Sequence, residues 1–299
     1  MITDKITICA MSLKGLKSIE AIIEEFGPEI IDMVITAEDK NVQKDYYKEI
    51  KELCDANNIS VRLNNNDTIH PILTEYTFAI GWKWMLKIPA GKIIVLHDSL
   101  LPQYRGFAPL VTALMNGDTT LGVTAFIAND KPDEGSEICQ SSINISYPIT
   151  IKEVTEEIII CYTEIMLQIV GWIDRGAVIP SYPTNEDFAT YSIWLDKEDY
   201  KIDWDHYAEY IRLFIDAVGF PYQGARTNAK DWEYIVLEAE ELNENPKIEN
   251  RARHIGKVLR LEDGCPVVIC GDGLLKITKM ENLLRTNALP MHNLKTRFE

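Results

Sequence analysis

The chain has 299 residues, of which 46% are hydrophobic and 25% charged, so it can bury one large core or two smaller ones. Its 30 Lys and Arg residues against 46 Asp and Glu residues give a net charge of −16, which disfavours nucleic acid as a partner. No apolar run reaches the ~20 residues of a membrane span, and no signal peptide is recognisable. Six cysteines without a CxxC pair predict reduced core residues, a cytoplasmic location and no metal site.

The first half of the chain predicts alternating strands and helices. Apolar residues at helical spacing predict a helix that ends at Gly27 and a second helix over residues 41–58, with Val42 and Tyr46 on its apolar face. Five nearly unbroken apolar runs predict buried strands at residues 6–11, 29–36, 59–63, 76–82 and 91–97. This alternation is typical of an α/β fold with a Rossmann-like, mostly parallel sheet and helices on both faces.

The following segment continues the same pattern. A short helix over residues 108–117 should end at Gly117, and residues 121–129 should form the next strand. Thr150 and Glu153 form a capping box that predicts the start of one long helix, which ends at Gly176.

The last third of the chain has a different composition and predicts a second, smaller domain. A polar, aromatic linker precedes a helix at about residues 206–218. Three short strands with Gly-containing turns follow over residues 255–281, which favours an OB-like β-barrel. We therefore predict two domains, residues 1–185 and residues 186–299.

Two loops carry the side chains with catalytic chemistry. His97 directly follows a predicted buried strand, where open α/β sheets bind their ligands, and a histidine there can serve as a general base or a hydrogen-bond donor. The next strand is followed by Asp130, Asp133 and Glu134, and a carboxylate that faces His97 would orient the imidazole. A hydrogen-bonded core histidine and solvated turn acids are the alternatives, and both stay open at this point.

Residues 96–140, "LHDSLLPQYRGFAPLVTALMNGDTTLGVTAFIANDKPDEGSEICQ", resemble the core of the folate-dependent formyltransferases. The resemblance includes the spacing of eleven positions between Gly122 and Asp133. The segments "TYSIWLDKEDYKIDWD" and "GKVLRLEDGCPVVICGDGLLKITKM" resemble two-domain members, which act on methionyl-tRNA or on nucleotide-linked amino sugars. The matching positions of the core are His97, Ser99, Leu100, Leu101, Pro102, Arg105, Gly106, Ala108, Pro109, Asn116, Gly117, Gly122, Val123, Thr124, Asp133 and Gly135.

The resemblance implies an enzyme that transfers a formyl group from N10-formyltetrahydrofolate to an amine. It assigns proton transfer or oxyanion stabilisation to His97, and orientation of the imidazole to Asp133. It also implies a folate site, without a metal, at Gly81, Trp82, Lys83, Trp84, Met85, Ser99, Leu100, Asp130 and Gly135.

One position departs from the family. An Asn usually stands two residues before the His, and here that position is Val95, which cannot donate a hydrogen bond to an oxyanion. Loss of one such donor typically costs about 2.7–4 kcal/mol of transition-state stabilisation. Asn129 is a conceivable replacement, and a non-catalytic protein that binds folate or sugar nucleotide is the alternative.

The acidic charge favours one acceptor over the other. Binding of tRNA requires several Lys or Arg contacts to phosphate, whereas a sugar nucleotide requires only one or two. We therefore predict a UDP- or dTDP-linked amino-deoxy sugar as acceptor, for bacterial surface glycans such as lipopolysaccharide, with methionyl-tRNA as the alternative. Homodimer formation is left open. The residues predicted to bind the acceptor are Arg105, Gly106, Trp194, Tyr222 and Arg226.

Overall fold

The computed structural model describes residues 3–64, 74–86 and 92–299. The chain divides into two compact units that are interleaved in sequence. The first unit comprises Met1–Leu110, Thr119–Ile145 and Glu153–Ile193, and the second comprises Val111–Asp118, Ser146–Lys152 and Trp194–Glu299. The domain boundary that we predicted between residues 185 and 186 stays a prediction.

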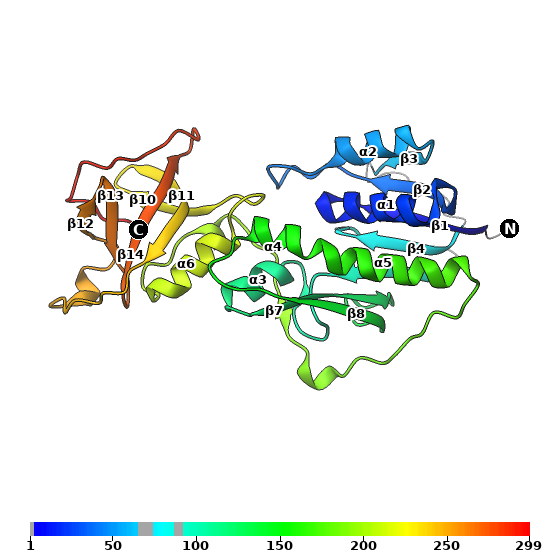
Figure 1. Cartoon of the computed structure of the whole chain (residues 1–299). Helices are drawn as coiled ribbons and strands as arrows, with labels where there is room; N and C mark the ends of the chain where they lie inside the picture. The colour runs from blue at the N-terminus through cyan, green and yellow to red at the C-terminus, as the bar shows by residue number, and fades with distance from the viewer. Residues whose placement is uncertain (1–2, 65–73, 87–91) are drawn as a thin grey trace. The chain divides into compact units, whose positions relative to one another are not determined.

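The first unit contains a seven-stranded sheet in the order β3-β2-β1-β4-β5-β7-β8 (Figure 1). The first five strands in that order run parallel to one another, which confirms the mostly parallel sheet. The strands are β1 Thr3–Ala10, β2 Ile31–Thr36, β3 Ser60–Leu63, β4 Thr74–Ile80, β5 Lys92–His97, β7 Thr120–Ile127 and β8 Ser136–Asn144.

The last two strands run against this direction. β7 is antiparallel to β5, and β8 is antiparallel to β7. The strand predicted at residues 121–129 is present as β7, and β8 was not predicted. The loop at residues 128–135 is too short for a crossover, so it can join β7 and β8 only as antiparallel neighbours.

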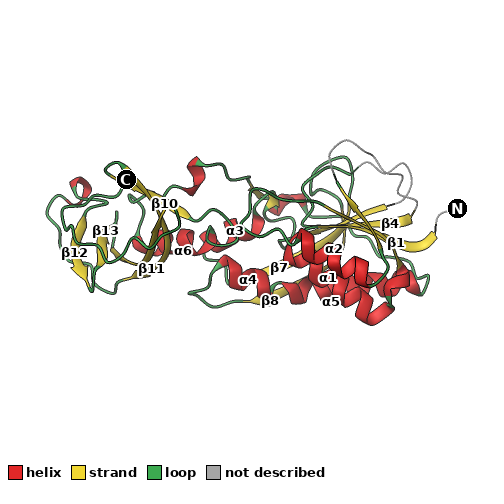
Figure 2. Cartoon of the chain, turned by 90° about the horizontal axis from the view of Figure 1, so that it is seen from above, coloured by secondary structure: helices red, strands yellow, loops and turns green. Residues whose placement is uncertain are grey.

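Three helices of the first unit lie together on one side of the sheet (Figure 2). They are α1 Ser12–Phe26, α2 Tyr47–Ala56 and α5 Ile159–Asp174, and α1 packs against both of the others. α1 ends at Gly27 as predicted. The predicted start of α2 at residue 41 was wrong, because Tyr46 has a left-handed φ of 63° and the helix begins after it.

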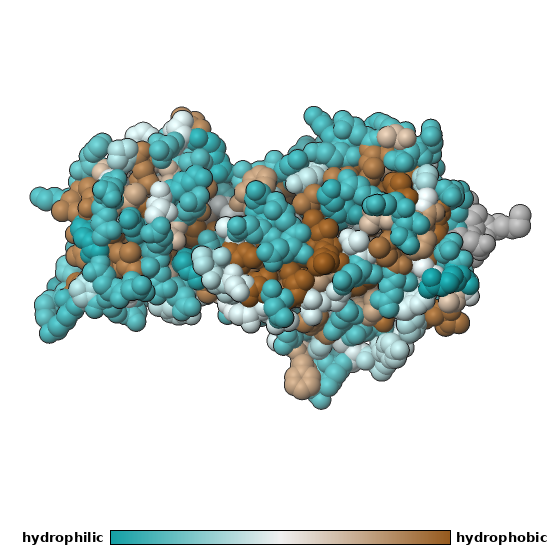
Figure 3. Space-filling model, in the orientation of Figure 1, coloured by the Kyte–Doolittle hydropathy of each residue, from teal (hydrophilic) through white to brown (hydrophobic). Residues whose placement is uncertain are grey.

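The predicted single helix from Thr150 to Gly176 was also wrong. It is divided at Ile158 into α4 Ile151–Glu157 and α5. Apolar side chains gather on the outer face near this division (Figure 3), where Ile160 is 54% exposed. Within the described ranges, no helix has both the length and the apolar character that crossing a membrane requires.

The register of the central strands places the candidate site. Val95 of β5 lies opposite Phe126 of β7, and His97 lies opposite Thr124. β5 also pairs with β4 in parallel, and β4 pairs with β1 in parallel. The carboxyl ends of β1, β4 and β5 therefore meet at one edge of the sheet, which is where ligands bind in open α/β folds.

The second unit contains a five-stranded antiparallel sheet in the order β10-β11-β14-β13-β12, against which α6 Ala208–Ala217 packs. Three of the strands were predicted, and β10 and β11 were not. The C-terminal segment joins the two edge strands, because Asn228 N donates to Glu299 O at 2.9 Å and Val258 N donates to Thr296 O at 3.0 Å. The strands are β10 Ala225–Ala229, β11 Trp232–Glu241, β12 Val258–Glu262, β13 Cys265–Ile269 and β14 Leu274–Asn282.

Candidate active site

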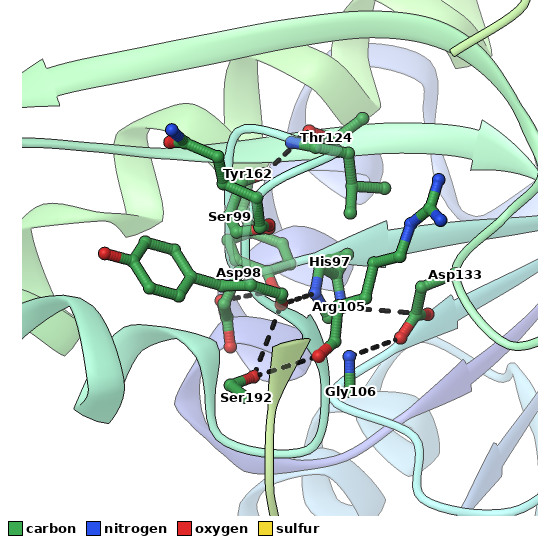
Figure 4. Close-up of polar contacts among 12 residues, drawn as sticks. His97, Asp98, Ser99, Arg105, Gly106, Thr124, Asp133, Tyr162 and Ser192 are labelled. Carbon is green, nitrogen blue, oxygen red and sulfur yellow. Dashed lines mark hydrogen bonds and ion pairs between the residues drawn. The ribbon is translucent and has the colours of Figure 1, made fainter. Parts of the chain in front are cut away.

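His97 is the last residue of β5 and is 8% exposed. Its Nε2 lies 2.8 Å from the carbonyl oxygen of Tyr104, and a carbonyl oxygen can only accept, so Nε2 carries a proton. Its Nδ1 lies 3.8 Å from Oδ1 of Asp133 (Figure 4). In the neutral imidazole the basic, unprotonated nitrogen is therefore Nδ1, on the side of the carboxylate.

Asp133 lies in the loop that joins β7 to β8. Its backbone has a left-handed φ of 53°, and its Oδ2 accepts a hydrogen bond of 2.8 Å from the backbone N–H of Gly106. One carboxylate oxygen is thus anchored while the other faces His97. The structure brings Asp133 to His97, as we expected from the sequence, and the catalytic role of the pair stays a prediction.

Gly106 makes this anchoring possible. It lies in β6 Arg105–Gly106, which pairs in parallel with β9 Tyr191–Ser192. Its φ is +113°, and a Cβ at this position would lie 2.1 Å from the Ser192 carbonyl oxygen. Only glycine allows β6 to approach β9 this closely while its N–H donates to Asp133.

Buried hydrogen bonds shape the loop between β5 and β6. Ser99 is 4% exposed, and its Oγ donates to Gln103 O at 2.6 Å. Thr124 Oγ1 donates to Ser99 O at 2.6 Å and accepts from Leu101 N at 3.0 Å. The Ser99 hydroxyl thus stabilises the conformation of the loop. Thr124 was visible in the sequence only as part of the Gly-Val-Thr pattern, and its bracing role was missed.

Arg105 is almost fully enclosed, with 1% exposure. Its Nη1 and Nη2 donate to the two carboxylate oxygens of Glu186 at 2.7 and 2.9 Å. This pairing with Glu186 raises the pKa of the Arg105 guanidinium further. Arg105 was expected to contact a diphosphate. In the structure its terminal nitrogens pair with Glu186, and its role in acceptor binding stays a prediction.

The other residues predicted for the acceptor lie in the second compact unit. Trp194, Tyr222 and Arg226 belong to it, whereas His97 and Asp133 belong to the first. Arg226 Nη1 already donates to Glu233 Oε1 at 3.0 Å. Trp194 is 58% exposed.

The predicted folate segment follows β4. Gly81 has a φ of +59°, and Trp82 packs against a buried cluster of Cys9, Met33 and Ile35. Burial raises the pKa of the Cys9 thiol to about 12, so this cluster stays uncharged. The rings of Trp82 and Trp84 meet edge to face with centroids 5.1 Å apart.

Two polar atoms at this edge are buried and unpaired. Trp82 Nε1 and Ser12 Oγ have no hydrogen-bond partner among residues 3–64, 74–86 and 92–299. Ser12 Oγ lies 3.2 Å from where a Cβ on Gly81 would be, so the two groups border the same turn. Buried polar groups normally have partners, and these two are therefore suited to a bound ligand.

The remaining residues of the predicted folate site have other surroundings. Lys83 forms an ion pair with Asp39, and Met85 is 68% exposed.

The other predicted folate residues lie in different loops. Leu100 packs so closely on Gly122 that a Cβ on Gly122 would lie 2.4 Å from Leu100 Cδ2. Gly135 is required for backbone packing, because its Cβ would lie 2.0 Å from Ile127 O. Asp130 is exposed. Residues 87–91, which complete the predicted loop, lie outside the described residues.

Asn129 does not replace the Asn that Val95 displaces. Its Nδ2 donates to Glu134 O at 2.9 Å, and its Oδ1 accepts from Lys131 N at 2.8 Å, so its amide is used within its own loop. Across the described ranges, no group of three or more His, Cys, Asp or Glu side chains is arranged to hold a metal ion.

A buried ion pair beside His97 was missed by sequence analysis. Asp98 Oδ2 accepts from Lys14 Nζ at 2.5 Å, and Asp98 Oδ1 accepts from the Tyr162 hydroxyl at 2.7 Å. Burial opposes ionisation of Asp98, but Lys14 and the Tyr162 hydroxyl outweigh it and hold its pKa below the ordinary 3.8. The signal in the sequence was Lys14, a lysine on the buried face of the first helix.

Comparison with known proteins identifies the family of the chain. Residues 33–170 match the formyl transferase family, and residues 195–290 match the formyl transferase C-terminal domain. The chain belongs to the formyl transferase family. The recognition from residues 96–140 is thereby confirmed, as is the two-part fold class.

Curated relatives that match the chain are named methionyl-tRNA formyltransferase. The methionyl-tRNA formyltransferase of Flavobacterium johnsoniae is 31% identical over 212 residues, 66% of this chain and 67% of the relative. That of Clostridium novyi is 26% identical over 306 residues, 93% and 96% of the two chains.

Solved structures share the fold. The N-formyltransferase from Helicobacter canadensis, in complex with folinic acid and dTDP-3-aminofucose, has a TM-score of 0.67 at 17% identity and covers 93% of this chain and 99% of its own. WlaRD, a sugar 3N-formyl transferase solved with dTDP and 5-N-formyl-THF, has a TM-score of 0.66 at 18% identity, with coverages of 96% and 99%.

Proposed function

We propose that this formyltransferase transfers the formyl group of N10-formyltetrahydrofolate to the amine of a UDP- or dTDP-linked amino-deoxy sugar. The observation that carries the catalytic part is the basic Nδ1 of His97, which faces Asp133 at the ligand-binding edge of the sheet. A base there is suited to accept a proton from an attacking amine.

The reaction follows from this geometry. The neutral amine attacks the formyl carbon and forms a C–N bond, and the carbonyl oxygen becomes an oxyanion. His97 Nδ1 takes the amine proton, and the Asp133 carboxylate stabilises the resulting imidazolium across the 3.8 Å gap. The intermediate collapses, the bond from the formyl carbon to N10 breaks, and the proton passes to N10 of tetrahydrofolate. Val95 provides no donor to the oxyanion, so the imidazolium is the charge that stabilises it.

The folate donor is supported by the side chains at the turn after β4. Trp82 supplies an apolar aromatic wall, and its Nε1 and Ser12 Oγ are buried polar groups available to a ring system with hydrogen-bonding edges. Structures with the same fold contain folinic acid, 5-N-formyl-THF and tetrahydrofolic acid.

The acceptor is supported by side chains next to Gly106. Phe107 is 72% exposed, follows Gly106 directly, and its N–H donates to Ser192 O at 3.2 Å. Tyr191 of the paired strand is 62% exposed. These exposed rings beside the residue that anchors Asp133 suit stacking with a nucleobase.

Methionyl-tRNA is the second candidate, and the names of the curated relatives favour it. The net charge of −16 argues against it, because each phosphate contact to tRNA needs a basic side chain that is free to make it. We therefore favour a nucleotide sugar, like those named with the solved structures of the same fold, over methionyl-tRNA as the acceptor.

A formyl-transfer assay tests the proposal. The protein is mixed with N10-formyltetrahydrofolate and either a panel of UDP- and dTDP-linked 3-amino and 4-amino deoxyhexoses or methionyl-tRNA, and the products are followed by mass. We expect a gain of one formyl group on a single nucleotide sugar. Formylation of methionyl-tRNA alone would overturn the acceptor, and transfer to none of them would overturn the whole proposal.

A further inference from the structure

His97 and Asp98 are consecutive residues whose side chains contact different parts of the first unit. His97 faces Asp133 and the Tyr104 carbonyl, whereas Asp98 contacts Lys14 of α1 and Tyr162 of α5. Successive residues at the end of a strand point to opposite faces of the sheet. The Asp98 carboxylate therefore reaches α1 and α5, whereas the His97 ring faces Asp133 (Figure 4).

We propose that Lys14, Asp98 and Tyr162 form a positioning cluster that sets the placement of His97 for catalysis. This rests on the proposed function, since it takes His97 as the proton acceptor. Both carboxylate oxygens of Asp98 are used, Oδ2 at 2.5 Å from Lys14 Nζ and Oδ1 at 2.7 Å from the Tyr162 hydroxyl. The carboxylate is thus held at two points, from two helices, and cannot rotate freely.

The burial of the cluster argues against a role in stability alone. Lys14 and Asp98 keep side-chain exposures of 10% and 18%. A buried ion pair is a poor source of stability, because desolvation offsets much of its attraction and apolar side chains of similar volume are often as good. What such a pair supplies is a defined position for the backbone that carries it.

That backbone leads directly into the loop that forms the active site. Ser99 N donates to His97 O at 2.8 Å, and the loop goes on to Tyr104, whose carbonyl accepts from His97 Nε2. The middle of the loop is held by Thr124 and its end by Arg105. Asp98 holds its start, so loss of Asp98 lets the imidazole move relative to Asp133. Misplacement of a reacting group by about 1 Å can cost about 10²-fold in rate.

The groups that face Asp98 limit which variants are informative. From α1 it meets the Lys14 ammonium, from α5 the Tyr162 hydroxyl, and on its own strand the His97 ring. Asp98→Asn keeps the shape but leaves the ammonium unpaired, and Lys14→Met removes it at similar volume. Lys51→Met on α2 is a matched control, because Lys51 pairs with Asp55 at 2.5 Å on an exposed surface.

The decisive experiment compares Asp98→Asn, Lys14→Met, the double variant and Lys51→Met in the formyl-transfer assay, alongside unfolding in urea. We expect kcat to fall about 10²-fold in Asp98→Asn and in the double variant, with KM for the folate donor nearly unchanged. The double variant should regain the stability that Asp98→Asn loses, because no buried charge is left unpaired, without regaining kcat. Recovery of kcat together with stability would overturn the proposal.

A second measurement does not depend on turnover. The imidazole NMR signals of His97 should change in Asp98→Asn and in the double variant, and should stay unchanged in Lys51→Met. Unchanged His97 signals in the first two variants would also overturn the positioning role. If the wild-type protein formylates no acceptor, the proposed function fails while this spectroscopic test still decides whether the cluster positions His97.

Discussion

The Tyr104 carbonyl oxygen lies 2.8 Å from His97 Nε2 and so fixes which nitrogen of the ring is basic. Because the carbonyl accepts only, the neutral imidazole carries its proton on Nε2 and leaves Nδ1 free on the side of Asp133. A backbone group seven residues along the chain thus performs the orienting task that a carboxylate performs in many His-based sites. The carboxylate here faces the nitrogen that takes up the proton.

Substitution of the pair tests this arrangement directly. His97→Gln and Asp133→Asn should each lower kcat by about 10²- to 10⁴-fold, since each removes part of the proton transfer. Circular dichroism and donor binding should stay close to wild type, because neither change alters side-chain volume greatly. Near-normal turnover in His97→Gln would show that another group accepts the proton.

Gly106→Ala should lower the free energy of unfolding. Its φ of +113° and the 2.1 Å distance from a Cβ to Ser192 O force β6 away from β9. We expect a loss of more than about 3 kcal/mol in the free energy of unfolding, because backbone strain of about 1–3 kcal/mol adds to the overlap. Gly176→Ala is the control: its φ is +62° with nothing within 4 Å, so only about 1–2 kcal/mol is expected. Equal effects in urea unfolding would contradict the close β6–β9 approach.

Phe107→Ala should weaken acceptor binding selectively. If the exposed Phe107 ring stacks with the nucleobase, its removal should raise KM for the nucleotide sugar by about tenfold, since an aromatic pair contributes about 0.5–1.5 kcal/mol beyond the area it buries. KM for the folate donor should stay the same. Ile160→Ala removes an exposed apolar side chain from α5 instead, and should change neither constant. An unchanged KM for the nucleotide sugar in Phe107→Ala would show that the nucleobase does not stack on Phe107.

Folate binding should be visible in the fluorescence of Trp82. The indole packs beside the proposed donor pocket with its Nε1 unpaired among the described residues, so a bound pterin should quench it. Titration with 5-formyltetrahydrofolate should quench the wild-type emission, and Trp82→Phe should lose most of that change. Trp232→Phe, at an exposed position of β11, should retain it. Full quenching in Trp82→Phe would move the donor site away from this turn.

Asp98 should contribute a pH-dependent part of the stability. Its folded-state pKa is below the ordinary 3.8, so its stabilisation is complete above about pH 5 and is lost as the pH falls through the folded-state pKa. Relative to wild type, Asp98→Asn should lose about 3 kcal/mol at neutral pH, the lower end of the range for a broken buried pair, because the Asp98 side chain keeps 18% exposure.

Urea unfolding of the two proteins between about pH 7 and pH 3 measures this difference. The gap between wild type and Asp98→Asn should stay constant down to about pH 5 and shrink below about pH 4. A gap that widens on acidification would show that Asp98 is not the ionised partner of Lys14.

Much of the first unit follows from short-range patterns in the sequence. Five apolar runs became β1, β2, β3, β4 and β5, because an unbroken apolar strand is stable only where both faces of a sheet are covered. The end of α1 at Gly27 was equally local, since a φ of 82° favours glycine. The candidate pair His97 and Asp133 came from a motif whose spacing is visible in the chain itself.

Strand direction and side-chain partners depended on the tertiary structure. The apolar run at residues 120–127 is compatible with either direction, and only the folded chain shows that β7 pairs antiparallel with β5. The pairing of the Arg105 guanidinium with Glu186, 81 residues away, was not visible in the sequence. Asp98 likewise took its role from Lys14 and Tyr162, which lie 84 and 64 residues away. Composition and periodicity determine which segments are buried, whereas the pairing of charges distant in sequence is decided only when the folded chain brings them together.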